Sequence, residues 1–458
     1  MKINFIKLLY EEENNMRKNK GITLVALVVT IVVLLILAGV SINLVLGNNG
    51  IIAKAKDAET KSAEASQNDL KGMNGLVSEM EGALAGNGST GSGSGNGGAG
   101  GSGADTKVPA EATAETAPYF PDNTFTKKEG TIDTGLVIQD ASGNEYVWVV
   151  VPRTTAVYAT TGLGKTTFTD ADYTSIENDL KEYTKTYRGS TSFITDTWYA
   201  DDKNEGWLSE TEYKTLKNSM LKSVYENGGF YVGRYEAGIG TNRTSNTDKN
   251  SDGKYTMPST VPVSKADAYP YTRVTRTQAQ NLASNVNSGT KTSSLMFGVQ
   301  WDLVLAFMHN KGNIADSTLT SNSTTIGNYY NSTFDLNRGK YAQYNKLGNP
   351  WNNFDSALGS IVVSNETTGK MKKTEQSSYS NGILLTTGGT ERSNVMNIYD
   401  IAGNVSEWTL EKASRTSDLC DFRGGNFTDA GSSIAAASRH RGSADGSDST
   451  LGFRVSLF

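Results

Sequence analysis

A long run without charge near the N-terminus constrains the fold of this chain more than any other feature. From Ile22 to Leu46 no residue is charged, and few are polar. At a rise of about 1.5 Å per residue, a helix of this length crosses a hydrocarbon core of about 30 Å. Arg17, Lys18 and Lys20 come directly before the run. Because such basic flanks stay in the cytoplasm, we predict one membrane helix over residues 22–46, with the rest of the chain extracellular.

The sequence at the start of this run is more specific than that of an ordinary membrane anchor. Lys20-Gly21-Ile22-Thr23-Leu24-Val25 resembles the cleavage site of type IV prepilins. In that family a prepilin peptidase cuts after the glycine, and the new N-terminus is methylated. The resemblance implies a leader over residues 1–21, cleavage after Gly21, methylation of Ile22 and pilin-like subunits as partners. Ala26 stands where major pilins carry a glutamate, which favours a minor or merely anchored pilin-like protein; a plain single-pass anchor is the alternative.

The next segments are predicted to connect this helix to an outer domain. Over residues 50–85, apolar side chains recur at spacings that form one helical face, so we assign residues 47–85 to a helical extension. Residues 86–103 are almost entirely Gly, Ser and Asn, and the chain to Pro118 adds mainly Ala, Thr and Glu. So little apolar surface cannot offset the entropy of ordering. Residues 86–118 are therefore predicted to be a flexible linker.

Composition excludes several functional classes. The formal net charge is -5 and no basic stretch stands out, so the chain is not expected to bind nucleic acid. Cys420 is the single cysteine, which excludes an intramolecular disulfide framework and a multi-cysteine metal site. The 48 glycines indicate many turns and short strands rather than a helical bundle.

Three motifs near the C-terminus carry a second resemblance. They are Asn397-Ile-Tyr-Asp-Ile-Ala-Gly-Asn-Val-Ser-Glu-Trp408, Arg423-Gly-Gly-Asn-Phe427 and Leu451-Gly-Phe-Arg-Val455. In this order they resemble the signatures of the formylglycine-generating-enzyme (sulfatase-modifying-factor) family. Upstream, residues 143–149 and 229–237 are similar to earlier strands of that family. The resemblance implies an α+β fold of the loop-rich, C-type-lectin-like kind over residues 119–458.

Several elements of this domain are expected from local pattern. Residues 136–140 and 145–151 are predicted to form two strands joined by a turn. A surface helix is predicted over 275–287, with Thr275 as its N-cap, and a more buried helix over 294–308. Alternating apolar residues over 451–457 predict a central strand.

The family's oxidase chemistry is not expected here. Its members oxidise a substrate cysteine with copper and oxygen, using a cysteine pair just after the R-G-G motif. In this chain Asp429 stands where the first cysteine would be, and the second has no counterpart. Cys420 precedes Arg423 and cannot substitute by position. We therefore predict neither copper nor enzymatic activity; an active formylglycine-generating oxidase is the least favoured interpretation.

Calcium is the cofactor that the resemblance implies. The family binds it at the positions of Asp400, Gly403, Val405 and Glu407, through carboxylates and backbone carbonyls. Hard oxygen ligands suit Ca²⁺. The alternative is a hydrogen-bonded polar cluster without a metal.

A second stretch matches part of a calcium-binding loop. Asp248, Asn250, Asp252 and Gly253 match the first half of a D-x-N-x-D-G loop. The position of its bidentate glutamate is Ser259. This favours an ordinary solvated turn.

The segment from Thr428 to Thr450 is rich in small and polar residues and lies between two of the family motifs. In lectin-like relatives this interval is the exposed ligand-binding surface, which implies a set of contact residues here. They are Thr428, Asp429, Ser432, Ser433, Arg439, His440, Arg441 and Asp445. The alternative is a plain surface loop. Aromatic and amide side chains in 327–331 and 348–353 also suit carbohydrate contacts, or ordinary turns.

Together these features predict a membrane-anchored, exported, pilin-like protein. Its outer domain is expected to bind an extracellular ligand, a glycan or a protein, without catalysis. The alternative is a structural minor subunit of a type IV pilus or type II secretion filament.

Overall fold

The computed structural model describes residues 111–188, 194–201, 203–246, 249–344, 351–365, 367–413 and 419–458. The leader, the charge-free run, the helical extension and the linker up to residue 110 lie outside the described residues. Within the described part, no helix has the length and apolar character needed to cross a membrane.

An antiparallel six-stranded sheet forms the centre of the domain. Its strands, in spatial order, are β1 (Thr126–Glu129), β2 (Val137–Gln139), β3 (Glu145–Val150), β5 (Gly229–Gly233), β19 (Val455–Leu457) and β8 (Ser293–Leu295). The chain's last strand therefore lies between β5 and β8, with Leu457 opposite Tyr231 and Ser293. The predicted β2–β3 hairpin is present.

A second sheet contains residues from all three C-terminal motifs. It contains β17 (Arg439–Gly442), β16 (Cys420–Arg423), β15 (Ser406–Ala413) and β18 (Leu451–Phe453), and β4 (Ile194–Thr195) pairs with β15. The expected single strand over 451–457 is thus two short strands, one in each sheet, with Arg454 between them. The side chain of Arg454 is fully buried, so this residue links the two sheets.

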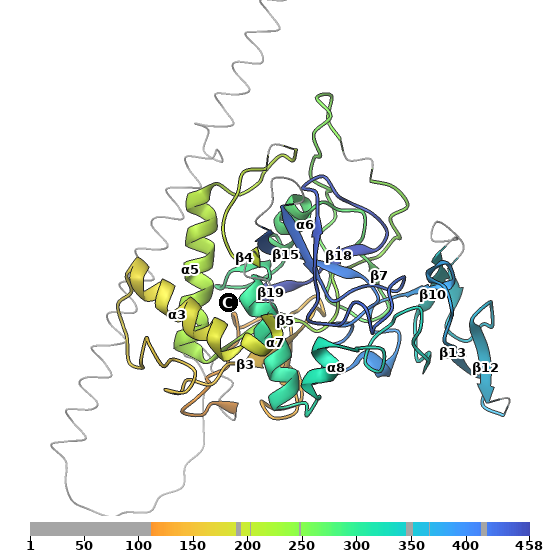
Figure 1. The fold of residues 1–458 in the computed structure, drawn as a ribbon, viewed down its shortest axis with the longest axis horizontal. Coiled ribbons are helices and arrows are strands. Elements are labelled where there is room, and N and C mark those ends of the chain that lie inside the picture. The colour runs from red at the N-terminus through yellow and green to blue at the C-terminus, as the bar shows by residue number, and fades with distance from the viewer. Residues whose placement is uncertain are drawn as a thin grey trace, which may run out of the picture. The chain divides into compact units, whose positions relative to one another are not determined.

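Helices cover one side of the domain, at the left of Figure 1, around α3 (Asp170–Tyr183) and α5 (Glu210–Asn227). Both begin with a complete capping box, at Thr169 and Ser209. The other helices are α4 (Lys185–Arg188), α6 (Arg276–Ser284), α7 (Gly298–Asn310) and α8 (Asp316–Thr320). The predicted N-cap at Thr275 is confirmed, with its side chain accepting a hydrogen bond from the backbone of Gln278.

The helix predicted over 294–308 is wrong at its start. Residues 293–295 form the edge strand β8, and α7 begins only at Gly298. The reason is tertiary: the carboxylate of Asp196 accepts hydrogen bonds from the backbone N–H groups of Gly298 and Val299, at 2.7 and 3.1 Å. An anion at this position satisfies the free donors of a helix N-terminus.

The end of the predicted linker also belongs to the folded domain. Thr116 is buried, donates a hydrogen bond to the carbonyl of Gly228 at 2.8 Å and accepts one from the indole of Trp148. Glu111 is buried as well. Glu111, Thr116 and Pro118 are thus buried although the segment lacks large apolar residues, whereas residues 112–115 between them are exposed.

Two small three-stranded sheets form the opposite side of the domain, where Figure 1 labels β10, β12 and β13. One contains β11 (Asn352–Asn353), β10 (Lys340–Gln343) and β14 (Ile383–Leu385). The other contains β12 (Ile361–Asn365), β13 (Lys370–Lys373) and β9 (Phe334–Asp335). They share a small core that includes Phe334, Tyr341 and Leu385. Further short elements are the strand pair β6 (Gly238–Ile239) and β7 (Tyr269–Pro270) and the 3-10 turns η3 (Tyr379–Asn381) and η4 (Glu391–Ser393).

Candidate ligand-binding site

The stretch from Asn397 to Trp408 follows a tightly turned path. Asp400 and Asn404 have left-handed φ angles of 59° and 58°, which these residue types tolerate better than most. Gly403 has φ 73°, and a Cβ there would lie 2.4 Å from the carbonyl oxygen of Asn328. Glycine is therefore required at this turn.

The acidic side chains of this stretch are buried and paired within the protein. Arg454 donates to both carboxylate oxygens of Glu407, with contacts of 2.6 to 3.1 Å. The carboxylate of Asp400 accepts from the Ser393 hydroxyl at 2.6 Å and from the Gly388 backbone at 2.8 Å. Burial raises the pKa of both carboxyl groups, and Arg454 partly offsets this.

A third carboxylate, Glu236, belongs to the same cluster and was not singled out from sequence. It accepts hydrogen bonds from Asn404 Nδ2 at 2.6 Å and from the Val405 backbone at 3.0 Å. Burial, followed by the negative charges of Asp400 and Glu407, raises its pKa well above the usual range. Its sequence signal was the Tyr235-Glu236 pair in the second family-like strand.

The calcium positions do not fit an ion as they are arranged here. Both oxygens of Glu407 are used by the guanidinium of Arg454, which already supplies a cation, and both oxygens of Asp400 accept protein donors. Within the described part of the chain, no group of three or more His, Cys, Asp or Glu side chains is placed to hold a metal. Calcium at Asp400, Gly403, Val405 and Glu407 stays a prediction.

The second predicted calcium loop is a hairpin turn in its described part. Asn250 Oδ1 accepts from the backbones of Asp252 and Lys254, each at 3.0 Å, and the backbone of Lys254 accepts from Asn250. Asp248 lies outside the described residues. The geometry matches the solvated-turn alternative, since the Asn250 oxygen is already engaged.

The predicted contact residues differ in burial. Arg439 is buried: its side chain is only 2% exposed. It is paired with Asp302 of α7 and Glu411 of β15, at 2.7 and 3.0 Å. Burial lowers the pKa of Arg439, but the two carboxylates outweigh this, and the pKa is raised overall. The expectation that Arg439 meets a ligand at the surface is thus wrong, because the residue anchors β17 from beneath.

Arg423, from the R-G-G motif, completes this inner network. It is fully buried and donates to Asp302 at 2.7 Å and to Glu411 at 3.0 Å. Arg188 of α4 also donates to Asp302, at 3.0 Å, so three arginines and two carboxylates hold α4, α7, β15, β16 and β17 together.

Four other predicted residues are exposed: Ser432, Ser433, Arg441 and Asp445. Thr428, Asp429 and His440 are half-buried. His440 stacks on Phe422, with ring centroids 5.8 Å apart, and burial lowers its pKa. Asp445 accepts a hydrogen bond from Ser443. Among the described residues, no hydrogen bond or ion pair joins Ser432 or Ser433 to Arg441 or Asp445.

Asp429, at the position of the family's first cysteine, is engaged in hydrogen bonds within the protein. Its carboxylate accepts from the backbone and the side-chain amide of Asn426, at 3.0 and 2.8 Å. The sulfur of Cys420 is elsewhere, buried, and 2.6 Å from the hydroxyl of Tyr199. Burial raises the pKa of this thiol. A buried thiol with a raised pKa is a poor metal ligand and nucleophile.

Two exposed aromatic residues beside the loop were missed by sequence reasoning. Tyr344 directly follows β10, and Tyr379 begins η3. The ring of Tyr344 lies 6.1 Å from that of Phe427 and 6.1 Å from that of Tyr379. Nothing in the local sequence pattern links these three positions, because they come from separate segments.

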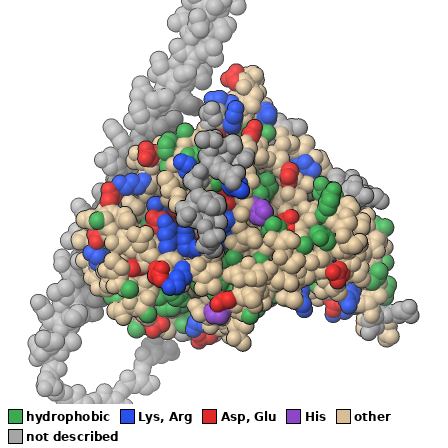
Figure 2. Space-filling view, in the orientation of Figure 1, with side chains coloured by type: hydrophobic (Ala, Val, Ile, Leu, Met, Phe, Trp, Pro, Cys, Tyr) green, Lys and Arg blue, Asp and Glu red, His purple; other side chains and the backbone are tan. Residues whose placement is uncertain are grey.

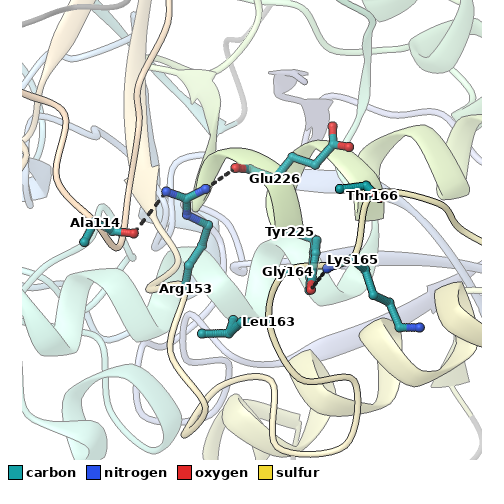
Figure 3. Close-up of a pocket in the computed structure, with 8 residues that line it drawn as sticks. All are labelled: Ala114, Arg153, Leu163, Gly164, Lys165, Thr166, Tyr225 and Glu226. Carbon is teal, nitrogen blue, oxygen red and sulfur yellow. Dashed lines mark hydrogen bonds between the residues drawn. The ribbon is translucent and has the colours of Figure 1, made fainter. Parts of the chain in front are cut away.

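A cavity of about 480 Å³ lies away from these residues (Figure 3). Arg153 crosses it and donates to the carbonyls of Glu226 and Ala114, at 2.6 and 3.0 Å. Lys165, also at its wall, pairs with Asp172 at 2.6 Å. None of the residues predicted to bind a ligand lines this cavity.

Comparison with known proteins agrees with the motif order. The sequence profile of the sulfatase-modifying factor enzyme 1-like domain matches residues 129–457. No curated protein matches the chain. Among solved structures, Treponema denticola variable protein 1 is 15% identical, with 50% of this chain and 84% of that chain covered and a TM-score of 0.25. CarF is 14% identical, with 73% of this chain and 92% of that chain covered and a TM-score of 0.22. Because the family profile spans most of its length, this chain belongs to the sulfatase-modifying factor enzyme 1-like (formylglycine-generating-enzyme) family.

Proposed function

We propose that this protein is a membrane-anchored, exported member of the family that displays a non-catalytic domain for binding an extracellular glycan or protein. The leader would be processed by a prepilin peptidase between Gly21 and Ile22. The membrane helix over 22–46 would keep the N-terminus in the cytoplasm and the domain outside.

The observation that carries the binding role is that buried ion pairs fix β16 and β17, while polar residues in and beside these strands are exposed. Beneath β16 and β17, Arg423 and Arg439 are held by buried carboxylates. By contrast, Ser432 in the preceding loop and Arg441 in β17 are exposed. Small polar residues on a rigid frame suit recognition, because the frame folds independently of the loop's chemistry.

The proposed lack of catalysis is supported by the number and position of the cysteines. The family's copper chemistry needs two cysteines, and this chain has only Cys420, which is buried against Tyr199. Asp429 at the first cysteine position is a hard oxygen ligand, which does not match Cu(I).

The binding role is tested with the full-length protein in lipid nanodiscs on glycan arrays and on intact cells. We expect specific binding that Arg441→Ala or Asp445→Ala weakens while the melting temperature stays unchanged. Absence of binding to both arrays and cells would contradict the proposal. Oxygen consumption with copper and a cysteine-containing peptide tests the oxidase alternative, and we expect none above background.

A structural subunit of a pilus or secretion filament is the second candidate. The Lys20-Gly21-Ile22-Thr23 sequence favours it, and Ala26 weighs against bulk polymerisation. Mass spectrometry of the mature N-terminus tests processing: methylated Ile22 supports the pilin-like interpretation, and an intact Met1 reduces it to a plain anchor. Co-purification of filament subunits would favour the structural role.

A further inference from the structure

Three aromatic rings lead from the core to the surface beside the C-terminal loop. Phe427 is fully buried, Tyr344 is 37% exposed and Tyr379 is 59% exposed. The Tyr344 ring is tilted by 53° against Phe427 and meets Tyr379 edge-on at 77°. Figure 2 shows hydrophobic side chains gathered at the surface in the region where Figure 1 labels β10. The three rings form a row that we call the aromatic row.

The row is held in place by backbone contacts rather than by its own hydroxyls. The backbone N–H of Tyr344 donates to the carbonyl of Gly382 at 3.0 Å, and the N–H of Gly382 donates to the carbonyl of Tyr379 at 2.9 Å. A Cβ on Gly382 would lie 2.3 Å from the Phe427 carbonyl, so only glycine allows this approach. Within the described part of the chain, no hydrogen bond engages the hydroxyl of Tyr344 or Tyr379. The outer rings are therefore preorganised, with their polar ends available.

The segment that carries Tyr379 is neutral from Gln376 to Gly382, although the exposed Glu375 precedes it. From Gln376 to Gly382 the chain reads Gln-Ser-Ser-Tyr-Ser-Asn-Gly, without any charge. Ser380 and Asn381 are exposed. On the loop side, the half-buried Thr428 follows Phe427 directly. Hydroxyl and amide groups donate and accept hydrogen bonds without selecting an ionic partner.

This combination fits a neutral sugar better than an anion or a protein. A hexopyranose has an apolar ring face that packs on an aromatic ring, and a rim of hydroxyls that pair with Ser, Asn and Tyr groups. A phosphate or nucleic acid needs Arg or Lys, which the 376–382 segment lacks. A stable protein partner needs about 800 Å² on each side, far more than two tyrosines and a short serine-rich turn present.

We propose that Tyr344 and Tyr379 form a stacking platform for neutral hexose-containing oligosaccharides, with Asn381 and Thr428 as hydrogen-bonding neighbours. This rests on the proposed display function and specifies its ligand class. It moves the centre of recognition from the 428–445 loop to the two tyrosines beside it.

The test uses the full-length protein in nanodiscs and calorimetric titration with neutral cello-, malto- and N-acetylchito-oligosaccharides. We expect at least one series to bind, and Tyr344→Ala or Tyr379→Ala to weaken binding by about tenfold or more, which corresponds to about 1.4 kcal/mol. Tyr344→Phe and Tyr379→Phe keep the ring and are expected to retain most of the affinity. Phe354→Ala is the matched control: Phe354 is equally exposed, at 37%, but lies at the other end of β10, where its backbone N–H donates to Gly339.

The contrary outcomes separate this proposal from the proposed function. Sugar binding that survives both alanine variants but is lost in Arg441→Ala or Asp445→Ala overturns the platform and leaves the display role intact. Binding of a protein but of no sugar overturns the ligand class. Absence of any extracellular ligand overturns both. Thermal unfolding of each variant excludes misfolding, and the two tyrosines are replaced separately, so that one alanine variant decides the test if the other fails to fold.

Discussion

Arg439 Nη2 donates to both carboxylate oxygens of Asp302, at 2.8 and 2.7 Å, although the two residues are far apart in the chain. This contact ties the base of β17 to helix α7. It also converts a residue that looks like part of a polar surface loop into part of the core.

Removal of this arginine should destabilise the fold strongly. Arg439→Ala leaves Asp302 and Glu411 buried with one cationic partner fewer, and breaking a buried pair in this way costs about 3–5 kcal/mol. Urea unfolding measures the loss. Arg441→Ala, two residues further and exposed, is the control and should leave the midpoint unchanged. Equal midpoints for both variants would contradict the buried role of Arg439.

The turn at Gly403 should not accept a side chain. Gly403→Ala places a Cβ against the Asn328 carbonyl at a φ of 73°, so we expect a loss of at least about 2 kcal/mol. Gly240 has open space around its Cβ position, and Gly240→Ala should leave the melting temperature nearly unchanged. The turn geometry is incorrect if calorimetry finds the two variants equally stable.

Lys373 should make stability depend on pH above neutrality. It is fully buried, and its amine donates to the carbonyls of Tyr329, Tyr330 and Ser332 at 2.8, 3.0 and 2.7 Å. Burial lowers its pKa to about 7, whereas an unfolded lysine has a pKa of about 10.4. Between these values the unfolded chain binds more protons, so the contribution of Lys373 to the free energy of unfolding rises with pH.

Urea unfolding at about pH 7.5 and pH 9.5 measures this slope, within the window set by the two pKa values. Lys373→Met should remove the rise, whatever its effect on overall stability. Lys370→Met, an exposed position on the same strand, should retain it. If the free energy of unfolding of Lys373→Met still rises with pH to the same extent, other groups cause the pH dependence.

Metal removal should leave the domain stable, because Arg454 already neutralises Glu407. We expect EDTA and added calcium to give the same melting temperature. A rise with calcium that Glu407→Gln abolishes would instead establish the predicted calcium site and require Arg454 to move aside.

Short-range sequence information was enough for the family, the order of its motifs and several local elements. The three C-terminal motifs lie where the family profile matches, and the Thr275 cap follows from hydrogen bonds within a few residues. The leader, the membrane helix and their topology rest on local sequence too, and stay predictions.

The start of α7 could not be predicted in this way, since its N-terminal donors are satisfied by Asp196 from a distant segment. The burial of Arg439 and the meeting of Tyr344, Tyr379 and Phe427 have the same origin. The sequence by itself determined which motifs this chain contains and which copper ligands it lacks. Only the tertiary structure decided which polar residues are paired in the core and which rings reach the solvent, because burial and ion pairing depend on contacts between segments far apart in the chain.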